Sequence, residues 1–316
     1  MLRAFAVKGG HLVEMGSGEL TARQLREAAW IDLQEPSEPE RQSVEALYPA
    51  SLPDADDVEE IEASARYFVD SQGIHVHSSF VYQSEGRHKT TTVAFTLKQN
   101  QLLTLRDVEL ADFRLFRMRT RRRQVEASNA LAILTSLFEQ KVENMADTIE
   151  DLHRELERVS IMVLEDLSAS MEDAIDELAE LEDSSGKVRL SVLDTQRSLS
   201  FLIRHIRQHP AEIETCREVL RDLNTLMAHT NFLFEKVNFL MDAALGFINI
   251  EQNQIIKIFS IAAVVFLPPT LVASLYGMNF HFMPELAWRW GYPFAISLMV
   301  LSGLAPYWYF KRKGWL

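Results

Sequence analysis

Apolar residues are concentrated near the C-terminal end of this 316-residue chain, where they form two long runs. Residues 255–276 carry a single charge, Lys257, and residues 292–310 carry none. A helix needs about 20 predominantly apolar residues to span a bilayer. Pro268 and Pro269 are tolerated in such a helix where neighbouring groups satisfy the backbone. A buried core hairpin is the alternative, but two adjacent runs of this length favour two membrane-spanning helices.

The charges that flank the two runs predict their orientation. Three basic residues lie in the tail 311–316, whereas the segment 277–291 between the runs has one arginine offset by one glutamate. The positive-inside rule then places both termini in the cytoplasm and segment 277–291 outside. The first 15 residues lack the long apolar core of a signal peptide, so we expect the rest of the chain to stay in the cytoplasm.

The N-terminal part of the chain has a different pattern. Short runs in which apolar and polar residues alternate are typical of strands with one buried face. The expected elements are a hairpin around Gly9-Gly10, a strand in residues 28–36, a helix that opens at Ser37, and strand–turn–strand units in residues 65–83 and 90–107. This order predicts an α/β domain over residues 1–123.

Long helices are expected after residue 123. Residues 124–208 contain little Gly or Pro and predict a helical hairpin. Pro210 suits the first turn of a third helix, and from there the pattern runs through a stalk, 209–254, into the first apolar run. A continuous helix of some 65 residues would be about 100 Å long at 1.5 Å per residue.

One face of that third helix carries small and polar residues. Steps of four and three residues place on one face a set that we call the polar row: Asp242, Gly246, Asn249, Asn253, Ile256, Ser260, Ala263, Leu267, Thr270 and Ser274. Helix packing explains small residues, but a carboxylate and two amides favour contact with water. One chain with two spans cannot enclose a pore, so we expect a ring of identical subunits. Ile256 and Leu267 would then form apolar constrictions, and Asp242, Asn253 and Thr270 would form polar rings.

Gly277, Met278 and Asn279 follow the first run directly, at its outer end. Gly and Asn are common helix stops, which is one explanation. The other is that main-chain carbonyls freed at the helix end and the Asn279 amide oxygen form a ring of neutral acceptors. Mg2+ gives up its waters reluctantly, so such a ring could bind the hydrated ion through its water shell. Zinc or copper would favour His or Cys ligands, and His281 is the sole candidate in this segment.

Composition narrows the function further. The formal net charge of −13 disfavours nucleic acid as a partner. Residues 172–183 hold seven acids and no base, which indicates either a solvated helix face or a surface that gathers cations near a pore mouth. A basic run could contact lipid or nucleic acid, or could pair with the surplus acids; it comprises Arg114, Arg117, Arg119, Arg121, Arg122 and Arg123.

Little in the sequence suggests catalysis. No nucleophile motif, phosphate loop or Cys/His metal spacing occurs, so we do not expect an enzyme. Cys216 is the single cysteine, which fits a reducing compartment. His75 and His77 alternate on one expected strand face without an evident third ligand, so we expect a structural role for both.

Several motifs resemble those of the CorA magnesium transporters. The resemblance is carried by Tyr276-Gly277-Met278-Asn279-Phe280, Met283-Pro284-Glu285-Leu286, Trp288, Gly291-Tyr292-Pro293 and the tail Lys311-Arg312-Lys313-Gly314-Trp315-Leu316. Similarity extends over nearly the whole chain. Residues 62–70, 187–202 and 247–259 look like the proteobacterial branch of that family.

The resemblance implies a homopentameric funnel in a bacterial inner membrane that passes Mg2+, and also Co2+ and Ni2+. It assigns capture of the hydrated ion to the triplet 277–279 and matches Thr270, Asn253 and Asp242 to pore rings. Family members also bind regulatory Mg2+ between cytoplasmic subunits through acids. Counting along the chain points to Glu218 and, in the stretch EEIEASARYF, to Glu60.

One position departs from the family pattern and keeps an alternative open. Where the family usually has an acid after Phe280, this chain has His281, which would weaken cation attraction, especially below about pH 6.5. Relatives that handle zinc share the architecture, so a zinc transporter is one alternative, although this chain keeps the residues 283–286. A membrane-anchored scaffold protein is another, and it leaves the polar row unexplained.

Energetics complete the prediction. A divalent ion that enters a negative interior gains about 4.6 kcal/mol per 100 mV, twice the value for a single charge. Influx is therefore downhill and needs no ATP motif, and none is present. We predict a passive, membrane-potential-driven Mg2+ influx channel. Intracellular Mg2+ held by cytoplasmic carboxylates would close it.

Overall fold

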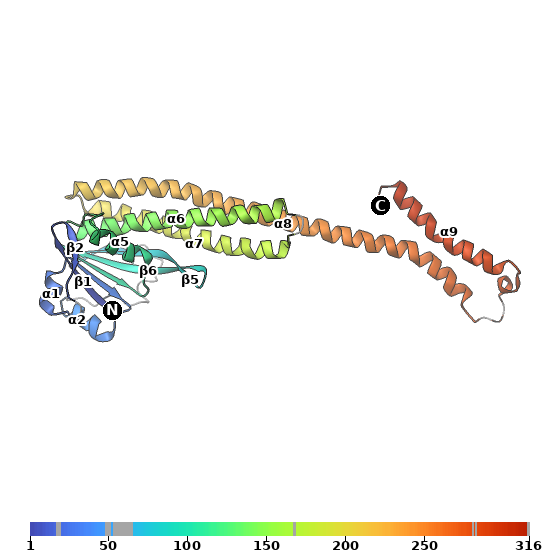
Figure 1. The fold of residues 1–316 in the computed structure, drawn as a ribbon, viewed down its shortest axis with the longest axis horizontal. Coiled ribbons are helices and arrows are strands. Elements are labelled where there is room, and N and C mark those ends of the chain that lie inside the picture. The colour runs from blue at the N-terminus through green and yellow to red at the C-terminus, as the bar shows by residue number, and fades with distance from the viewer. Residues whose placement is uncertain are drawn as a thin grey trace. The chain divides into compact units, whose positions relative to one another are not determined.

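The computed structural model describes residues 1–16, 20–47, 52, 66–166, 169–279, 281 and 283–314. These residues form two compact units, Met1–Met241 and Asp242–Leu316. Helix α8, Pro210–Tyr276, contributes residues to both units. An α/β part, a long helix and two candidate membrane helices are all present, so the predicted fold class is confirmed (Figure 1).

A seven-stranded sheet lies at the centre of the first unit. Its strands have the order β2-β1-β3-β7-β6-β5-β4, with β3 and β7 parallel and the other neighbours antiparallel. The hairpin expected at Gly9-Gly10 joins β1 to β2, and both glycines adopt positive φ there. The strands are β1 Leu2–Lys8, β2 His11–Glu14, β3 Trp30–Gln34, β4 Tyr67–Val69, β5 Ile74–Ser84, β6 Arg87–Lys98 and β7 Gln101–Arg106.

Short helices accompany the sheet. Helix α1, Ala22–Glu27, starts at a capping box formed by Thr21 and Gln24. Helix α2, Glu38–Glu45, starts at the expected Ser37, whose capping box is completed by Glu40. Helix α5, Ala111–Arg121, follows β7 and contains most of the basic run, for which the sequence pattern predicted no element.

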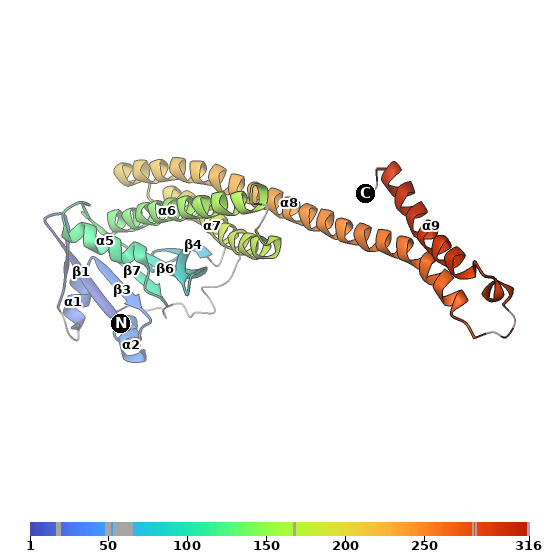
Figure 2. The same ribbon diagram turned by 45° about the vertical axis from the view of Figure 1, so that its right-hand side comes forward.

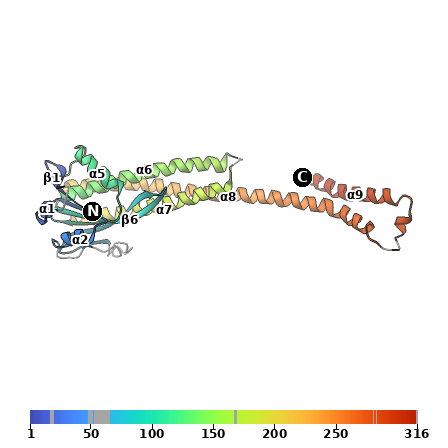
Figure 3. The ribbon, with the colours of Figure 1, turned by 60° about the horizontal axis from the view of Figure 1, so that its bottom comes forward.

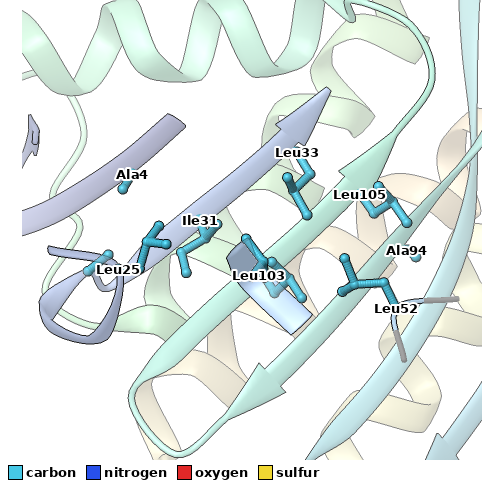
Figure 4. Packing of buried hydrophobic residues seen from close by; sticks show 10 residues of the cluster. Ala4, Leu25, Ile31, Leu33, Leu52, Ala94, Leu103 and Leu105 are labelled. Carbon is cyan, nitrogen blue, oxygen red and sulfur yellow. The ribbon is translucent and has the colours of Figure 1, made fainter. Parts of the chain in front are cut away.

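The two faces of the sheet bury different side chains, because successive strand residues point to opposite faces. On one face Ile31 and Leu33 of β3 and Leu103 and Leu105 of β7 join an aliphatic cluster that also includes Leu25 of α1 (Figure 4). Aromatic rings occupy the other face. Trp30 stacks on Phe5 with centroids 4.7 Å apart and meets Phe113 and Phe116 of α5 at 6.1 and 5.8 Å.

Three long helices complete the first unit. Helix α6, Ala130–Leu164, helix α7, Met171–His205, and the first part of α8 lie side by side in Figures 1, 2 and 3. His153 of α6 stacks on Phe232 of α8 at 5.4 Å, and Gln196 of α7 donates to Asn224 of α8 at 2.9 Å. The ring of His75 has polar partners on both nitrogens, Asp70 and Thr96, which supports its predicted structural role.

Several charged groups inside the first unit form ion pairs. Arg106 of β7 and Asp32 of β3 are completely buried and joined at 2.9 Å, and Arg117 of α5 lies 3.3 Å from the same carboxylate. Asp194 of α7 binds Arg66 at 3.1 Å and accepts a 2.7 Å hydrogen bond from the hydroxyl of Ser78.

The second unit is a helical hairpin. After α8 ends at Tyr276, a short 3-10 helix, η1 Pro284–Ala287, precedes helix α9, Gly291–Arg312. Gly291 is required there, because a Cβ would lie 2.3 Å from the carbonyl oxygen of Glu285. Both α8 and α9 contain windows long and apolar enough to cross a membrane, and those windows are almost entirely exposed.

Candidate ion-conduction site

The face of α8 that meets α9 is defined by close packing around Gly303. A Cβ at Gly303 would lie 3.2 Å from Cγ of Pro269 and 3.5 Å from the carbonyl oxygen of Val265. Ile261, Val265 and Val272 on the same face are half-buried. Small residues at such contacts let spanning helices approach closely. The α9-facing side of α8 is therefore Ile261, Val265, Pro269 and Val272.

The polar row lies on the opposite side of α8. At 100° per residue, Leu267 is about 160° around the helix from Val265. Leu267 is 64% exposed and Ile256 is 62% exposed. Nine members of the row are exposed and Gly246 is half-buried; the exposed ones are Asp242, Asn249, Asn253, Ile256, Ser260, Ala263, Leu267, Thr270 and Ser274. Apart from Gly246, the row is thus open to a partner or to solvent.

The chemistry along the row suits hydrated ions at its polar positions. The hydroxyl of Thr270 donates to the carbonyl oxygen of Phe266 at 2.7 Å, so its lone pairs remain available as acceptors. The residues that flank the row are large and apolar; Phe259, Phe266 and Leu271 are 71%, 69% and 63% exposed. One exposed side of the helix therefore offers a narrow stripe of small and polar residues, interrupted by Ile256 and Leu267, between two apolar flanks.

Gly277, Met278 and Asn279 end helix α8. The amide of Gly277 still donates to Ala273 in the helical pattern at 2.9 Å, and that of Met278 donates to Leu275 at 3.4 Å. Gly277 does not adopt the left-handed conformation that usually ends helices at glycine. Its lack of a side chain matters instead, since a Cβ would lie 3.1 Å from the Ala273 carbonyl oxygen.

Asn279 follows as an exposed side chain. Its amide makes no hydrogen bond to the residues that the structure describes, so both its oxygen and its nitrogen are available. His281 is exposed as well. Behind them, Trp288 packs on Phe294 of α9 at 5.8 Å, which fixes η1 against the start of that helix.

The candidate regulatory acids are placed unequally. Glu60 lies outside the described residues. Glu218 is exposed on α8, in the first unit. It lies near Glu139 of α6: burial raises the pKa of Glu139, and the charges of Glu143, Glu218 and Asp222 raise it further, against the opposing charge of Arg119.

The sequence did not reveal this acidic group, because α6 and α8 are about 80 residues apart at this point. Among described residues, no set of three or more His, Cys, Asp or Glu side chains could hold a metal ion within one chain. A divalent ion at Glu218 would therefore need ligands from water or from another copy.

The acidic run on α7 is partly neutralised. Glu177 pairs with Arg158, Glu180 with Arg87, and Asp183 with Lys187. The exposed acids Glu172, Asp173, Asp176 and Glu182 have no ion pair within the described part of the chain. The run thus retains negative charge on its solvent side.

An exposed apolar hairpin with a polar row, attached to an α/β unit through a continuous helix, is the architecture of a two-span membrane protein. A sequence model described as "CorA-like Mg2+ transporter protein" matches residues 26–312. The chain belongs to this family.

Individual relatives agree. The chain is 50% identical over 318 residues to the magnesium transport protein CorA of Salmonella typhimurium and 51% identical to that of Escherichia coli K12, with full coverage of each chain. Its fold matches the complete structure of the CorA magnesium transporter from Methanocaldococcus jannaschii, with a TM-score of 0.78, 19% identity, and coverage of 100% of this chain and 99% of that one.

Proposed function

We propose that this protein is a Mg2+ influx channel of the bacterial inner membrane, formed by a ring of copies with both termini in the cytoplasm. The observation that carries the proposal is the polar row, which is exposed on the side of α8 opposite α9. Within the span, lipid offers no hydrogen-bond partner to the hydroxyls of Ser260, Thr270 and Ser274, and the carboxylate and amides of the row lie in the stalk that leads into the span. A ring of helices with these rows turned inward satisfies them with water and provides the ion path.

The ring is proposed to contain five subunits, as in the family. A pentamer of a 36.2 kDa chain has a mass of about 181 kDa, five times the protomer. Native mass spectrometry in mild detergent measures this directly. A stable monomer or dimer would contradict a ring.

Ion capture is assigned to Gly277, Met278 and Asn279 at the outer mouth. The exposed Asn279 amide, repeated around the ring, offers neutral oxygens that accept hydrogen bonds from water on Mg2+. The ion then passes the polar rings of Thr270, Asn253 and Asp242. Two apolar rings, Leu267 and Ile256, set the narrow points, which close the pore when they are dry.

The proposed channel selects Mg2+ and also passes Co2+ and Ni2+, ions that hold their coordinated water tightly. Zinc is the alternative cargo. Zinc prefers histidine and cysteine ligands, and His281 is the one such residue in the described part of segment 277–291. The relatives that are 50% and 51% identical to this chain are named magnesium transport proteins, which supports Mg2+ as the transported ion here.

The test is uptake into proteoliposomes that contain a Mg2+ indicator and hold an inside-negative potassium diffusion potential. We expect uptake by the wild-type protein that stops when the potential is collapsed. Asn279→Ala should lower the initial rate at least tenfold, because every subunit loses its amide at once. Ser297→Ala, a polar change on α9 outside the row, is the matched control and should retain the wild-type rate.

The two failures of this experiment have different meanings. Normal uptake by Asn279→Ala would contradict the capture role of the triplet but would leave a channel. No Mg2+ uptake by correctly assembled wild-type protein would contradict the function itself and would favour a scaffold role.

Closure is proposed to depend on Mg2+ bound between cytoplasmic acids of neighbouring subunits, with Glu218 and Glu60 as ligands. Glu218 already lies among Glu139, Glu143 and Asp222, so added cations would relieve repulsion there. A few kcal/mol of preferential binding suffices to shift such an equilibrium.

Limited proteolysis checks this regulatory role. Millimolar Mg2+ should protect the wild-type first unit, and the combined change Glu218→Lys and Glu60→Lys should weaken that protection. Full protection of the double variant would exclude these two residues as the sensor.

A further inference from the structure

A cavity of about 580 Å3 lies between β1, β2 and α5 in the first unit. This volume falls within the range of roughly 300–1,000 Å3 that small-molecule sites occupy. Five arginines and two glutamates line it, which gives a formal charge of +3, whereas the whole chain carries −13. The arginines are Arg3, Arg114, Arg117, Arg121 and Arg122.

Two of these arginines are held in place by acids. Arg117 contacts Asp32 at 3.3 Å and Glu109 at 2.8 Å, and Arg121 pairs with Glu14. The Arg117 guanidinium is almost buried, so it forms a fixed positive group at the edge of the cavity. Ion pairs with acids therefore explain two arginines of the basic run, Arg117 and Arg121.

The other three guanidinium groups form no ion pair with an acid in the described part of the chain. Arg3 contacts the sulfur of Met1 at 3.3 Å, and neither it nor Arg114 or Arg122 forms an ion pair with any described residue. Burial lowers the pKa of Arg117, whereas the negative charge of Asp32 raises it. The positive charge of Arg3 lowers this pKa further. Like charges are therefore held close together around a hollow, an arrangement that a bound anion would stabilise.

We propose that this cavity binds a soluble anion that carries two or more phosphate groups, such as diphosphate or a nucleoside triphosphate. Guanidinium groups match phosphate oxygens in pairs, and several of them converging on one hollow favour a multivalent anion over a single phosphate. The side chains of Met1 and Met118 at the same cavity provide apolar surface for an organic group on that anion. None of the residues that line this cavity belongs to the polar row, so the proposal does not depend on the ion-conduction role of that row.

Calorimetric titration of the full-length protein in a non-ionic detergent tests the proposal. The buffer contains EDTA and no Mg2+, and the probes are diphosphate, ATP and, as an uncharged comparison, adenosine. We expect micromolar dissociation constants for diphosphate and ATP, no binding of adenosine, and weaker anion binding as NaCl is raised from 50 to 300 mM.

The variant Arg114→Gln/Arg122→Gln should weaken both anions at least tenfold. Both side chains are exposed and lack ion pairs in the described structure, so the melting temperature should stay unchanged. The control Arg204→Gln/Arg207→Gln removes the same charge far along the chain and should bind as the wild type does. If the double variant unfolds, each single variant replaces it, with an expected loss of at least threefold.

Four results would overturn the proposal. One is absence of binding at millimolar diphosphate, and a second is equal weakening in the cavity and control variants. The third is that phosphatidylglycerol in mixed micelles binds at the cavity while diphosphate does not, which would identify a lipid headgroup as the ligand. Dissociation of the oligomer by Arg114→Gln/Arg122→Gln without anion binding would also contradict it, because the cavity would then receive an acidic segment of a second copy.

Discussion

The two units of this chain differ in the side chains that they bury and expose: the first buries apolar and charged groups, whereas the second leaves most of its apolar side chains exposed. In Met1–Met241 the fully buried groups include the ion pair Asp32–Arg106, whereas in Asp242–Leu316 Phe259 is 71% exposed and Ala295 is the one residue of α9 that is buried. Burying charge in a protein is unfavourable unless partners satisfy it. Exposing so much apolar surface to water is unfavourable as well.

This contrast indicates that water surrounds the first unit and that lipid surrounds much of the second. The first unit has an aliphatic cluster on one face of its sheet, aromatic rings on the other, and paired charges, which is how a water-soluble domain is organised. In the proposed channel, lipid covers the apolar flanks of the second unit and other copies of the chain cover its polar row. An exposed apolar side chain therefore contacts water in the first unit and lipid in the second.

A matched pair of substitutions distinguishes exposure to water from exposure to lipid, and it has the largest expected effect. Leu190 on α7 and Phe266 on α8 are 66% and 69% exposed. Phe266→Arg should reduce membrane-inserted protein severalfold or more, since a central arginine opposes insertion by about 3 kcal/mol. Leu190→Arg should have little effect. Quantitative blotting of the membrane fraction checks both, and equal yields would break the comparison.

A smaller effect is expected at a buried acid of the first unit. Burial raises the pKa of Asp112 from 3.8 to about 6, although the charge of Lys141 acts in the opposite direction. The folded-state pKa exceeds the unfolded value, so ionised Asp112 lowers stability above about pH 6 and has no such effect below about pH 4. The shift corresponds to about 3 kcal/mol at most.

Asp112→Asn should therefore raise the melting temperature at pH 8 by a few degrees, and the difference from the wild type should shrink as the pH falls from 6 to 4. Asp107→Asn, a nearby exposed carboxylate, is the control and should show no such dependence. A lower melting temperature for Asp112→Asn at pH 8 would mean that the buried charge is stabilising.

Much of the fold could be predicted because its signals are local. The helix that opens at Pro210, the end of α8 at Tyr276 and the hairpin at Gly9-Gly10 follow from single residues and hydrophobic runs. The polar row was predicted from helical periodicity alone, and nine of its ten members are exposed in the structure.

What could not be predicted depends on contacts between distant segments. The approach of Glu139 to Glu218 needs the packing of α6 on α8, and the basic cavity needs α5 beside β1 and β2. Gly277 shows another limit: the sequence explained it as a helix stop, whereas the structure relates it to crowding against Ala273. Steric reasons of this kind require coordinates.

The claim that the polar row lines the ion path can be measured with single cysteines. The native Cys216 is 1% exposed, and burial raises its pKa to about 12, so it contributes little background. Ala263 belongs to the row, and its neighbour Val264 lies on the apolar flank, 42% exposed. Both are exposed in the isolated chain.

The measurement is the rate at which Ala263→Cys and Val264→Cys react with a charged, water-soluble thiol reagent in proteoliposomes, with Mg2+ removed by chelator so that the pore is open. The account predicts that Ala263→Cys reacts at least tenfold faster, because its thiol faces water in the pore while that of Val264→Cys faces lipid or protein. Equal rates, or faster reaction of Val264→Cys, would contradict a pore lined by the polar row.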